Sequence, residues 1–94
     1  MLVTYDVATD TPAGRRRLRR VAQVCEAYGQ RVQKSVFECV VNLAELELLR
    51  HRLAAEIEPA EDSLRIYRLR EPRQRYVEIM GREPRFDLRD PLVV

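Results

Sequence analysis

Hydrophobic and polar positions along the first third of the chain predict a strand followed by an amphipathic helix. Residues 2–7 form a short run rich in strand-forming side chains, and turn-forming residues follow it up to Pro12. Apolar side chains then recur every three or four residues over residues 18–28 and stop before Gly29. Glycine is a common residue just past the end of a helix, so we expect the helix to run from Pro12 to that point.

The middle of the chain predicts two strands and a second helix. Residues 31–42 are rich in strand formers, but the apolar side chains change parity near Ser35, which indicates two strands joined by a sharp bend. Asn42 is followed three residues later by Glu45, a spacing typical of a capping box. Leucines then recur at helical spacing, so we expect a helix that ends before Pro59.

The last third of the chain predicts further strands. Residues 64–69 alternate between apolar and polar and predict a fourth strand, and residues 76–81 predict a fifth short one. The order β-α-β-β-α-β with an extra carboxyl-terminal strand is that of a ferredoxin-like α+β fold, with both helices on one face of an antiparallel sheet. We assign residues 1–81 to this domain and residues 82–94 to a tail with its own strand. The apolar end of the tail, residues 92–94, is expected to pair across a homodimer, because it would otherwise expose a sheet edge.

Size and composition indicate one small domain. The chain has 94 residues, of which 46% are hydrophobic and 34% charged, so it can bury a modest core and would gain further burial by dimerising. Neither a membrane-spanning run nor a signal peptide is expected, which predicts a cytoplasmic protein without a membrane partner. Cys25 and Cys39 fit apolar core positions, and His51 is the only histidine, so neither a zinc site nor serine-type catalysis is expected.

The charges are unevenly distributed, although the net charge is only +2. Residues 13–37 contain seven Arg or Lys against one Glu, whereas residues 38–62 contain seven acids against two Arg. The densest basic group lies at the amino end of the first predicted helix, where cations oppose the helix dipole. It is either a solvated surface or a phosphate-binding surface. We call it the basic helix face; it consists of Arg15, Arg16, Arg17, Arg19 and Arg20.

Asp6 is the strongest candidate for chemistry, because it places a carboxylate at the end of a predicted central strand. A buried charge there would cost on the order of several kcal/mol unless it were paired or bound to a cation. Mg²⁺ is usually held by one or two carboxylates together with waters and substrate oxygens. One Asp6 is too few for a firm site, but two copies facing each other across a two-fold axis would be enough. The alternative is that Asp6 only caps the turn into the first helix.

Five motifs follow one another along the chain: Tyr5-Asp6-Val7 at the end of the first strand and residues 16–22, 28–38, 62–67 and 86–92. In this order and at these spacings they resemble the small nuclease family of CRISPR adaptation, the second of the numbered CRISPR-associated proteins. The tail and the loop at residues 9–14 resemble its type I-C subgroup.

The resemblance implies a homodimer in which two Asp6 carboxylates meet around Mg²⁺ or Mn²⁺. Members of the family are described as metal-dependent endonucleases on single-stranded RNA or double-stranded DNA. They also form the central dimer that joins two dimers of the spacer integrase, the first of the numbered CRISPR-associated proteins. Carried over by position, Asp6 would be the metal ligand and Tyr5 its neighbour, while Arg31, Ser35 and Phe37 would line the site.

The expected function is therefore CRISPR spacer acquisition by a Mg²⁺-dependent endonuclease that also binds DNA, with RNA as a further candidate. The basic helix face and Lys34 would contact the nucleic acid, and Lys34 stands where many relatives carry an uncharged or aromatic residue. One alternative is a catalytically silent scaffold of the integrase complex, in which Asp6 is structural. Another is a module that stacks single-stranded RNA on sheet aromatics such as Phe37 and Tyr67.

Overall fold

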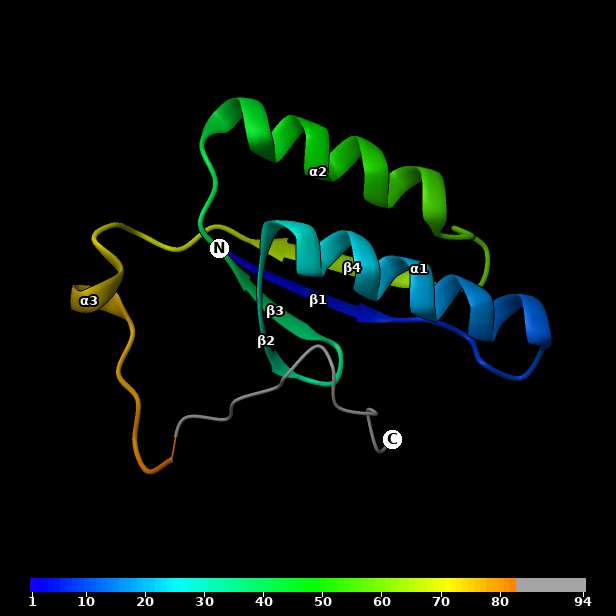
Figure 1. Cartoon of the computed structure of the whole chain (residues 1–94), viewed down its shortest axis with the longest axis horizontal. Helices are drawn as coiled ribbons and strands as arrows, with labels where there is room; N and C mark the ends of the chain where they lie inside the picture. Colours follow the sequence, from blue (N-terminus) through cyan, green and yellow to red (C-terminus); the bar gives the residue numbers. More distant parts are fainter. Residues whose placement is uncertain (83–94) are drawn as a thin grey trace.

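A four-stranded antiparallel sheet carries both long helices on one face (Figure 1). The computed structural model describes residues 1–82, and the strands lie in the order β2-β3-β1-β4. β1 is therefore a central strand, and the topology is the expected ferredoxin-like one. The elements are β1 (Leu2–Asp6), α1 (Pro12–Tyr28), β2 (Gly29–Gln33), β3 (Val36–Cys39), α2 (Leu43–Glu56), β4 (Ser63–Tyr67) and α3 (Arg73–Tyr76).

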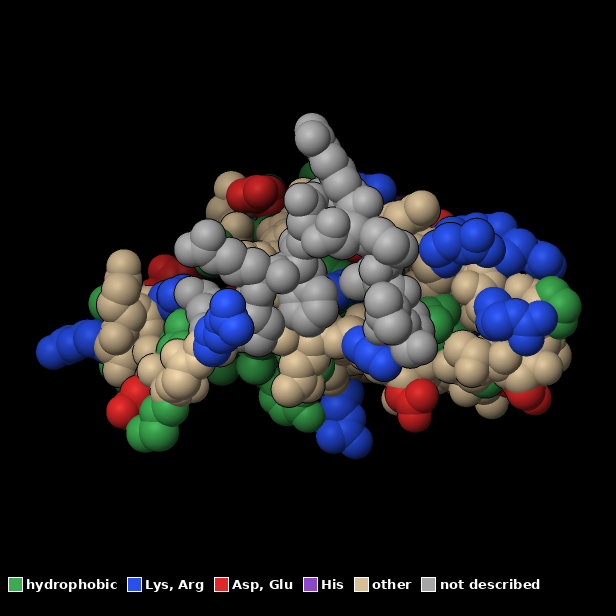
Figure 2. All heavy atoms as spheres, turned by 60° about the horizontal axis from the view of Figure 1, so that its bottom comes forward, with side chains coloured by type: hydrophobic (Ala, Val, Ile, Leu, Met, Phe, Trp, Pro, Cys, Tyr) green, Lys and Arg blue, Asp and Glu red, His purple; other side chains and the backbone are tan. Residues whose placement is uncertain are grey.

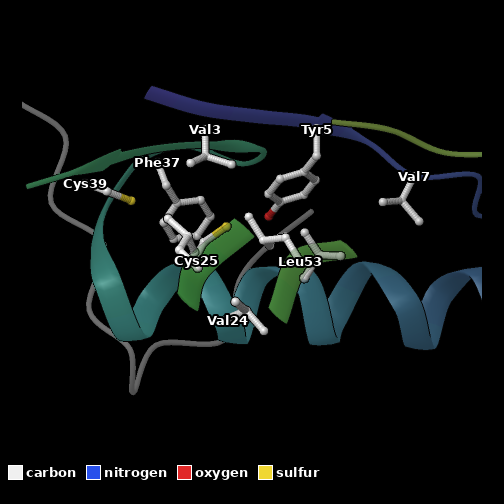
Figure 3. Close-up of a cluster of buried hydrophobic side chains, with 10 residues drawn as sticks. Val3, Tyr5, Val7, Val24, Cys25, Phe37, Cys39 and Leu53 are labelled. Carbon is white, nitrogen blue, oxygen red and sulfur yellow. The ribbon is translucent and has the colours of Figure 1, made fainter. Parts of the chain in front are cut away.

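The core fills the space between the sheet and the two long helices. Alternate residues of β1 point toward the helices, and Figure 3 shows Val3, Tyr5 and Val7 facing α1, which contributes Val24 and Cys25. Burying a side chain of this size stabilises the fold by roughly 1.5–3 kcal/mol. The buried cluster consists of Val3, Tyr5, Val7, Val21, Val24, Cys25, Phe37, Cys39, Leu49 and Leu53.

The ends of α1 are fixed by a side-chain cap and by a close strand contact. Thr11 caps the helix, because its hydroxyl oxygen accepts a hydrogen bond of 3.0 Å from the Gly14 amide. The helix ends at Gly29, as expected, but the backbone there is extended, with φ −164°. A Cβ atom at Gly29 would lie 2.3 Å from the carbonyl oxygen of Glu38. Glycine is therefore needed there because β3 passes close by.

The predicted capping box of α2 is confirmed. The Glu45 amide donates to Asn42 Oδ1 at 2.8 Å, and the Asn42 amide donates to Glu45 Oε1 at 3.2 Å. Of the predicted leucine stripe, Leu46, Leu49 and Leu53 are buried, whereas Leu43 is exposed at the start of the helix. The stripe therefore reaches the core only from Leu46 onward.

The predicted bend near Ser35 is confirmed as the turn of the β2–β3 hairpin. The turn consists of Lys34 and Ser35, and the strand register shifts between Arg31 and Gln33. The Ser35 carbonyl also accepts a 3.1 Å hydrogen bond from the Tyr5 amide, which fixes the turn beside the end of β1.

Two predicted strands differ from the structure. The fourth strand is shorter than expected and ends at Tyr67. The fifth strand, expected over residues 76–81, is wrong: Arg73–Tyr76 form the helical turn α3, and the Val77 amide donates to the Arg73 carbonyl instead of to a neighbouring strand. The nearby Ile79 and Met80 side chains are exposed, so they are not buried against the part of the chain that the structure describes. The tail strand and its pairing across a dimer lie outside the described residues.

Both cysteines are buried and free, as predicted. Burial raises the pKa of the Cys25 thiol to about 12, so the thiol stays protonated and is no nucleophile at neutral pH. His51 is exposed on α2, also as predicted. Within residues 1–82, the helices are too short or too polar to cross a bilayer.

Candidate functional site

Asp6 ends the central strand on the face of the sheet that the helices leave open. The preceding residue, Tyr5, is buried under the helices, and alternation along a strand turns Asp6 to the opposite face, where it is exposed. Within residues 1–82, the Asp6 carboxylate makes neither a hydrogen bond nor an ion pair, and the side chain that caps α1 is that of Thr11. The interpretation of Asp6 as a cap is therefore wrong, and the carboxylate faces solvent.

Other polar groups lie at the same end of the sheet. Asp6 pairs with Ser63, the first residue of β4, and the β2–β3 turn lies on the other side of β1. That turn presents Lys34, which is exposed, and Ser35, which is half-buried. Of the side chains expected around Asp6, the structure thus brings Ser35 and Lys34 to this end and adds Ser63, which the sequence analysis did not single out.

Arg31 and Phe37 do not line the site beside Asp6 in a single chain, and that expectation is wrong. Phe37 is fully buried and Arg31 is 7% exposed, both on the helix-covered side. Their place follows from strand alternation, since Arg31, Phe37 and Tyr5 all belong to the buried set of their strands. Whether they act in catalysis stays a prediction, but they lie beneath the sheet and not on the face of Asp6.

These three residues form a packed support under the end of β1. The Tyr5 and Phe37 rings stack with centroids 6.2 Å apart, and the Arg31 guanidinium lies 5.0 Å from the Phe37 centroid. Arg31 also pairs with Glu26 at 3.3 Å. The Tyr5 hydroxyl donates a long hydrogen bond of 3.4 Å to the Lys34 carbonyl. Burial raises the pKa of Tyr5 to about 12, so this hydroxyl is no general base at neutral pH.

The basic helix face lies at the end of the molecule where α1 begins. Figure 2 shows Lys and Arg side chains gathered there, at the right of the view. Arg15 is exposed and donates to the Thr9 carbonyl at 3.2 Å. Arg20 is 3.9 Å from Glu56, a distant pairing. Arg16 and Arg19 are exposed and make no ion pair with residues 1–82.

Arg17 differs from its neighbours because its guanidinium is already paired. Its Nε atom donates to Asp62 at 2.9 Å, and its Nη2 atom donates to Glu61 at 3.0 Å. The Asp62 side chain has no exposed surface, and its pKa is lowered chiefly by the hydrogen bond from Arg17. Sequence reasoning missed this pair, because the two residues are far apart in sequence and only the fold brings them together. The predicted phosphate contact of Arg17 stays untested.

Within residues 1–82, Asp6 is an exposed, unpaired carboxylate at this end of the sheet, and a cation bound there would need further ligands. No group of three or more His, Cys, Asp or Glu side chains that could hold a metal occurs within residues 1–82. Asp6 fits an oxygen-ligand role for Mg²⁺ or Mn²⁺, because it is exposed and unpaired, but other ligands would have to come from water, substrate or a second copy. The donor set of residues 1–82 is thus compatible with a shared site and does not by itself form a complete one.

Comparisons with known proteins agree on one family. The family described as "CRISPR associated protein Cas2" matches residues 1–77. CRISPR-associated endoribonuclease Cas2 1 of Moorella thermoacetica is 57% identical over 94 residues, which cover 100% of this chain and 98% of that protein. CRISPR-associated endonuclease Cas2 of Halalkalibacterium halodurans is 50% identical over 93 residues, covering 99% and 97% of the two chains.

The fold agrees with solved structures of similar proteins. A crystal structure of Cas2 from Streptococcus pyogenes superposes with a TM-score of 0.74 at 57% identity, covering 85% of this chain and 96% of that one. A hypothetical protein from Thermus thermophilus superposes with a TM-score of 0.71 at 36% identity, covering 88% and 90%. The topology, the motifs around Asp6 and these full-length similarities lead to one conclusion: the chain belongs to the Cas2 family of CRISPR-associated proteins.

Proposed function

We propose that this protein is a metal-dependent endonuclease of CRISPR spacer acquisition, in which Asp6 from each of two protomers holds Mg²⁺ or Mn²⁺. One observation carries the proposal: Asp6 is an exposed, unpaired carboxylate at the end of a central strand, on the open face of the sheet. The names of the relatives, endoribonuclease and endonuclease, support phosphodiester hydrolysis as the reaction.

The residues of this chain would have different roles in the reaction. The two Asp6 carboxylates would hold the cation, and a bound cation would supply an activated water and neutralise charge on the scissile phosphate. Lys34, exposed at the same end of the sheet, adds a positive charge beside the path of the nucleic acid. The stacked Tyr5 and Phe37 rings keep the end of β1 in place from beneath. Arg16 and Arg19 are available for phosphates further along the backbone.

The same surface also supports a second candidate, a silent scaffold that only holds DNA. The exposed arginines of α1 favour it, because phosphate binding needs no cleavage centre. We further propose that the protein acts in the cytoplasm as a dimer that bridges the CRISPR integrase, and that it belongs to the type I-C subgroup.

The test compares wild type with Asp6→Asn on short duplex DNA and on single-stranded RNA, with Mg²⁺, with Mn²⁺ and with EDTA. Asp10→Asn is the matched control, because Asp10 is also an exposed aspartate but lies in the loop outside the sheet. We expect metal-dependent cleavage by wild type and Asp10→Asn, and a loss of at least 100-fold in Asp6→Asn with DNA binding retained. The substrate that is cleaved then identifies the preference for RNA or DNA.

Two outcomes would overturn parts of the proposal. Full metal-dependent cleavage by Asp6→Asn would show that the site is elsewhere. Intact duplex binding without cleavage of either substrate by wild type would favour the scaffold.

A further inference from the structure

A buried carboxylate that the proposed reaction does not use is hydrogen-bonded to the loop that follows Asp6. Asp62 Oδ1 accepts a 3.1 Å hydrogen bond from the Ala8 amide, two residues after Asp6. Asp62 also directly precedes Ser63, the residue that pairs with Asp6 across the sheet. The Asp62 side chain therefore ties the loop leaving β1 to the strand that flanks Asp6.

Arg17 fixes the orientation of this carboxylate. Its Nε atom donates to Asp62 Oδ2 at 2.9 Å and its Nη2 atom donates to Oδ1 at 3.3 Å, a two-point contact that sets the plane of the carboxylate. Asp62 Oδ2 also accepts from the Glu58 amide at 2.8 Å. Since Arg17 belongs to α1 and Asp62 precedes β4, the contact joins two elements far apart in sequence.

We call the hydrogen bond from the Ala8 amide to Asp62 the tether. It matters for Asp6 because Asp6 is the last residue of its strand. The β1–β4 pairing ends at Asp6 and Ser63, and the β1–β3 pairing ends earlier, at Thr4 and Val36. The last residue of a strand opens more readily than the residues behind it. A displacement of about 1 Å in a catalytic group can reduce a rate by about 100-fold. The tether holds the chain at Ala8, just beyond Asp6, where the pairing of β1 with β3 and β4 has ended.

We propose that Asp62, oriented by Arg17, is a positioning residue that holds the Asp6 carboxylate in the geometry needed to bind the cation. Asp62 itself touches neither cation nor substrate, because its side chain is fully buried. The inference rests on the proposed function, since it gives Asp6 its role in cleavage.

The test uses the full chain and compares Asp62→Asn with Asn42→Ala. The control removes the cap of α2, at the opposite end of the sheet from Asp6, and weakens the fold without touching the tether. Cleavage is measured at saturating substrate and Mn²⁺, at a temperature where circular dichroism shows each variant folded. Amide hydrogen exchange at Ala8 is measured in parallel, because it reports on the tether independently of activity.

We expect Asp62→Asn to lower kcat by at least tenfold, with KM for the nucleic acid nearly unchanged, and to speed exchange at Ala8 by a similar factor. Asn42→Ala should leave both unchanged. Should Asp62→Asn not fold, Arg17→Lys carries the test: it keeps the charge but loses the two-point contact, and we expect the same changes at smaller size.

Three results would overturn the inference. If Asp62→Asn keeps the kcat of wild type while amide exchange at Ala8 becomes faster, the tether is purely structural. Unchanged exchange at Ala8 would remove the tether itself. An equal loss of kcat in Asn42→Ala would assign the effect to stability. If wild type cleaves neither substrate, the proposed function fails, and the exchange data then describe the tether alone.

Discussion

At the scale of single residues, Asp62 makes the folded state sensitive to acid. Its pKa is lowered below the ordinary value of 3.8, chiefly by the hydrogen bond from Arg17. A carboxylate with a lowered pKa in the folded state contributes its full stability above its ordinary pKa and loses it as the pH falls through the folded value. Wild type at low pH should therefore come to resemble the Asp62→Asn variant.

The measurement is thermal unfolding of both proteins at pH 7 and near pH 3. Hydrogen bonds to a charged group contribute about 1.5–3 kcal/mol, so we expect Asp62→Asn to lower Tm clearly at pH 7 and less near pH 3, where loss of this contribution has begun. Glu61→Gln is the control, because Glu61 belongs to the same network but its side chain is 54% exposed. A Tm difference that is the same at both pH values would contradict the assignment.

At the scale of elements, the structure divides the arginines of α1 into two groups with different effects. Arg16 and Arg19 are exposed and without an ion pair in residues 1–82, whereas Arg17 is held by Asp62 and Glu61. Removing one phosphate-binding side chain should flatten the slope of log K against log salt by about 0.9 on duplex DNA. We expect the double variant Arg16→Gln, Arg19→Gln to weaken binding and flatten this slope, with Tm unchanged.

Arg17→Gln should do the opposite: it should lower Tm and leave the slope as in wild type. Arg50→Gln on α2 is a matched control, since Arg50 is exposed and pairs with Glu47, and it should change neither quantity. The readouts are binding titrations at several salt concentrations and thermal unfolding. A flatter slope in Arg17→Gln would show that its guanidinium leaves Asp62 to contact phosphate.

Local sequence patterns predicted the elements wherever the controlling contact lies within a few residues. Asn42 and Glu45 cap α2 across three residues, and Ser35 marks the hairpin turn, so both could be predicted. The tether of Ala8 to Asp62 spans 54 residues and depends on how the elements pack, so no local pattern carries it. The strand predicted over residues 76–81 is wrong for a related reason. Strand-forming residues need a neighbouring strand to pair with, and the described chain provides none at that point.

The candidate site was predicted only in part, because some of its features depend on local sequence and others on how the elements pack. Asp6 could be found, because a carboxylate that directly follows apolar strand residues would be costly to bury unpaired, which marks it as a candidate. The placement of Phe37 and Arg31 could not, because the motif gives their order along the chain but not the face of the sheet on which they lie. Alternation from Val3 and Tyr5 would have placed Asp6 on the open face had the helix-covered side been known.

At the scale of the whole molecule, the proposed shared site links metal binding to dimerisation. Two Asp6 carboxylates that face each other repel when no cation lies between them, and a cation that binds both stabilises the dimer by mass action. We expect Mn²⁺ to tighten the wild-type dimer and EDTA to weaken it. In Asp6→Asn the repulsion is absent, so the dimer should be tighter than wild type in EDTA and should not respond to Mn²⁺.

Sedimentation velocity over a range of protein concentrations, with Mn²⁺ and with EDTA, measures this directly. Asp10→Asn again serves as the control, since it removes the same charge from an exposed loop position. If the dissociation constant of the dimer is the same in Mn²⁺ and in EDTA, the two Asp6 residues do not lie together around a shared cation. Equal responses to Mn²⁺ in wild type and Asp6→Asn would assign the cation to another part of the interface. Because no cleavage is measured, the shared site is tested separately from the reaction that it is proposed to perform.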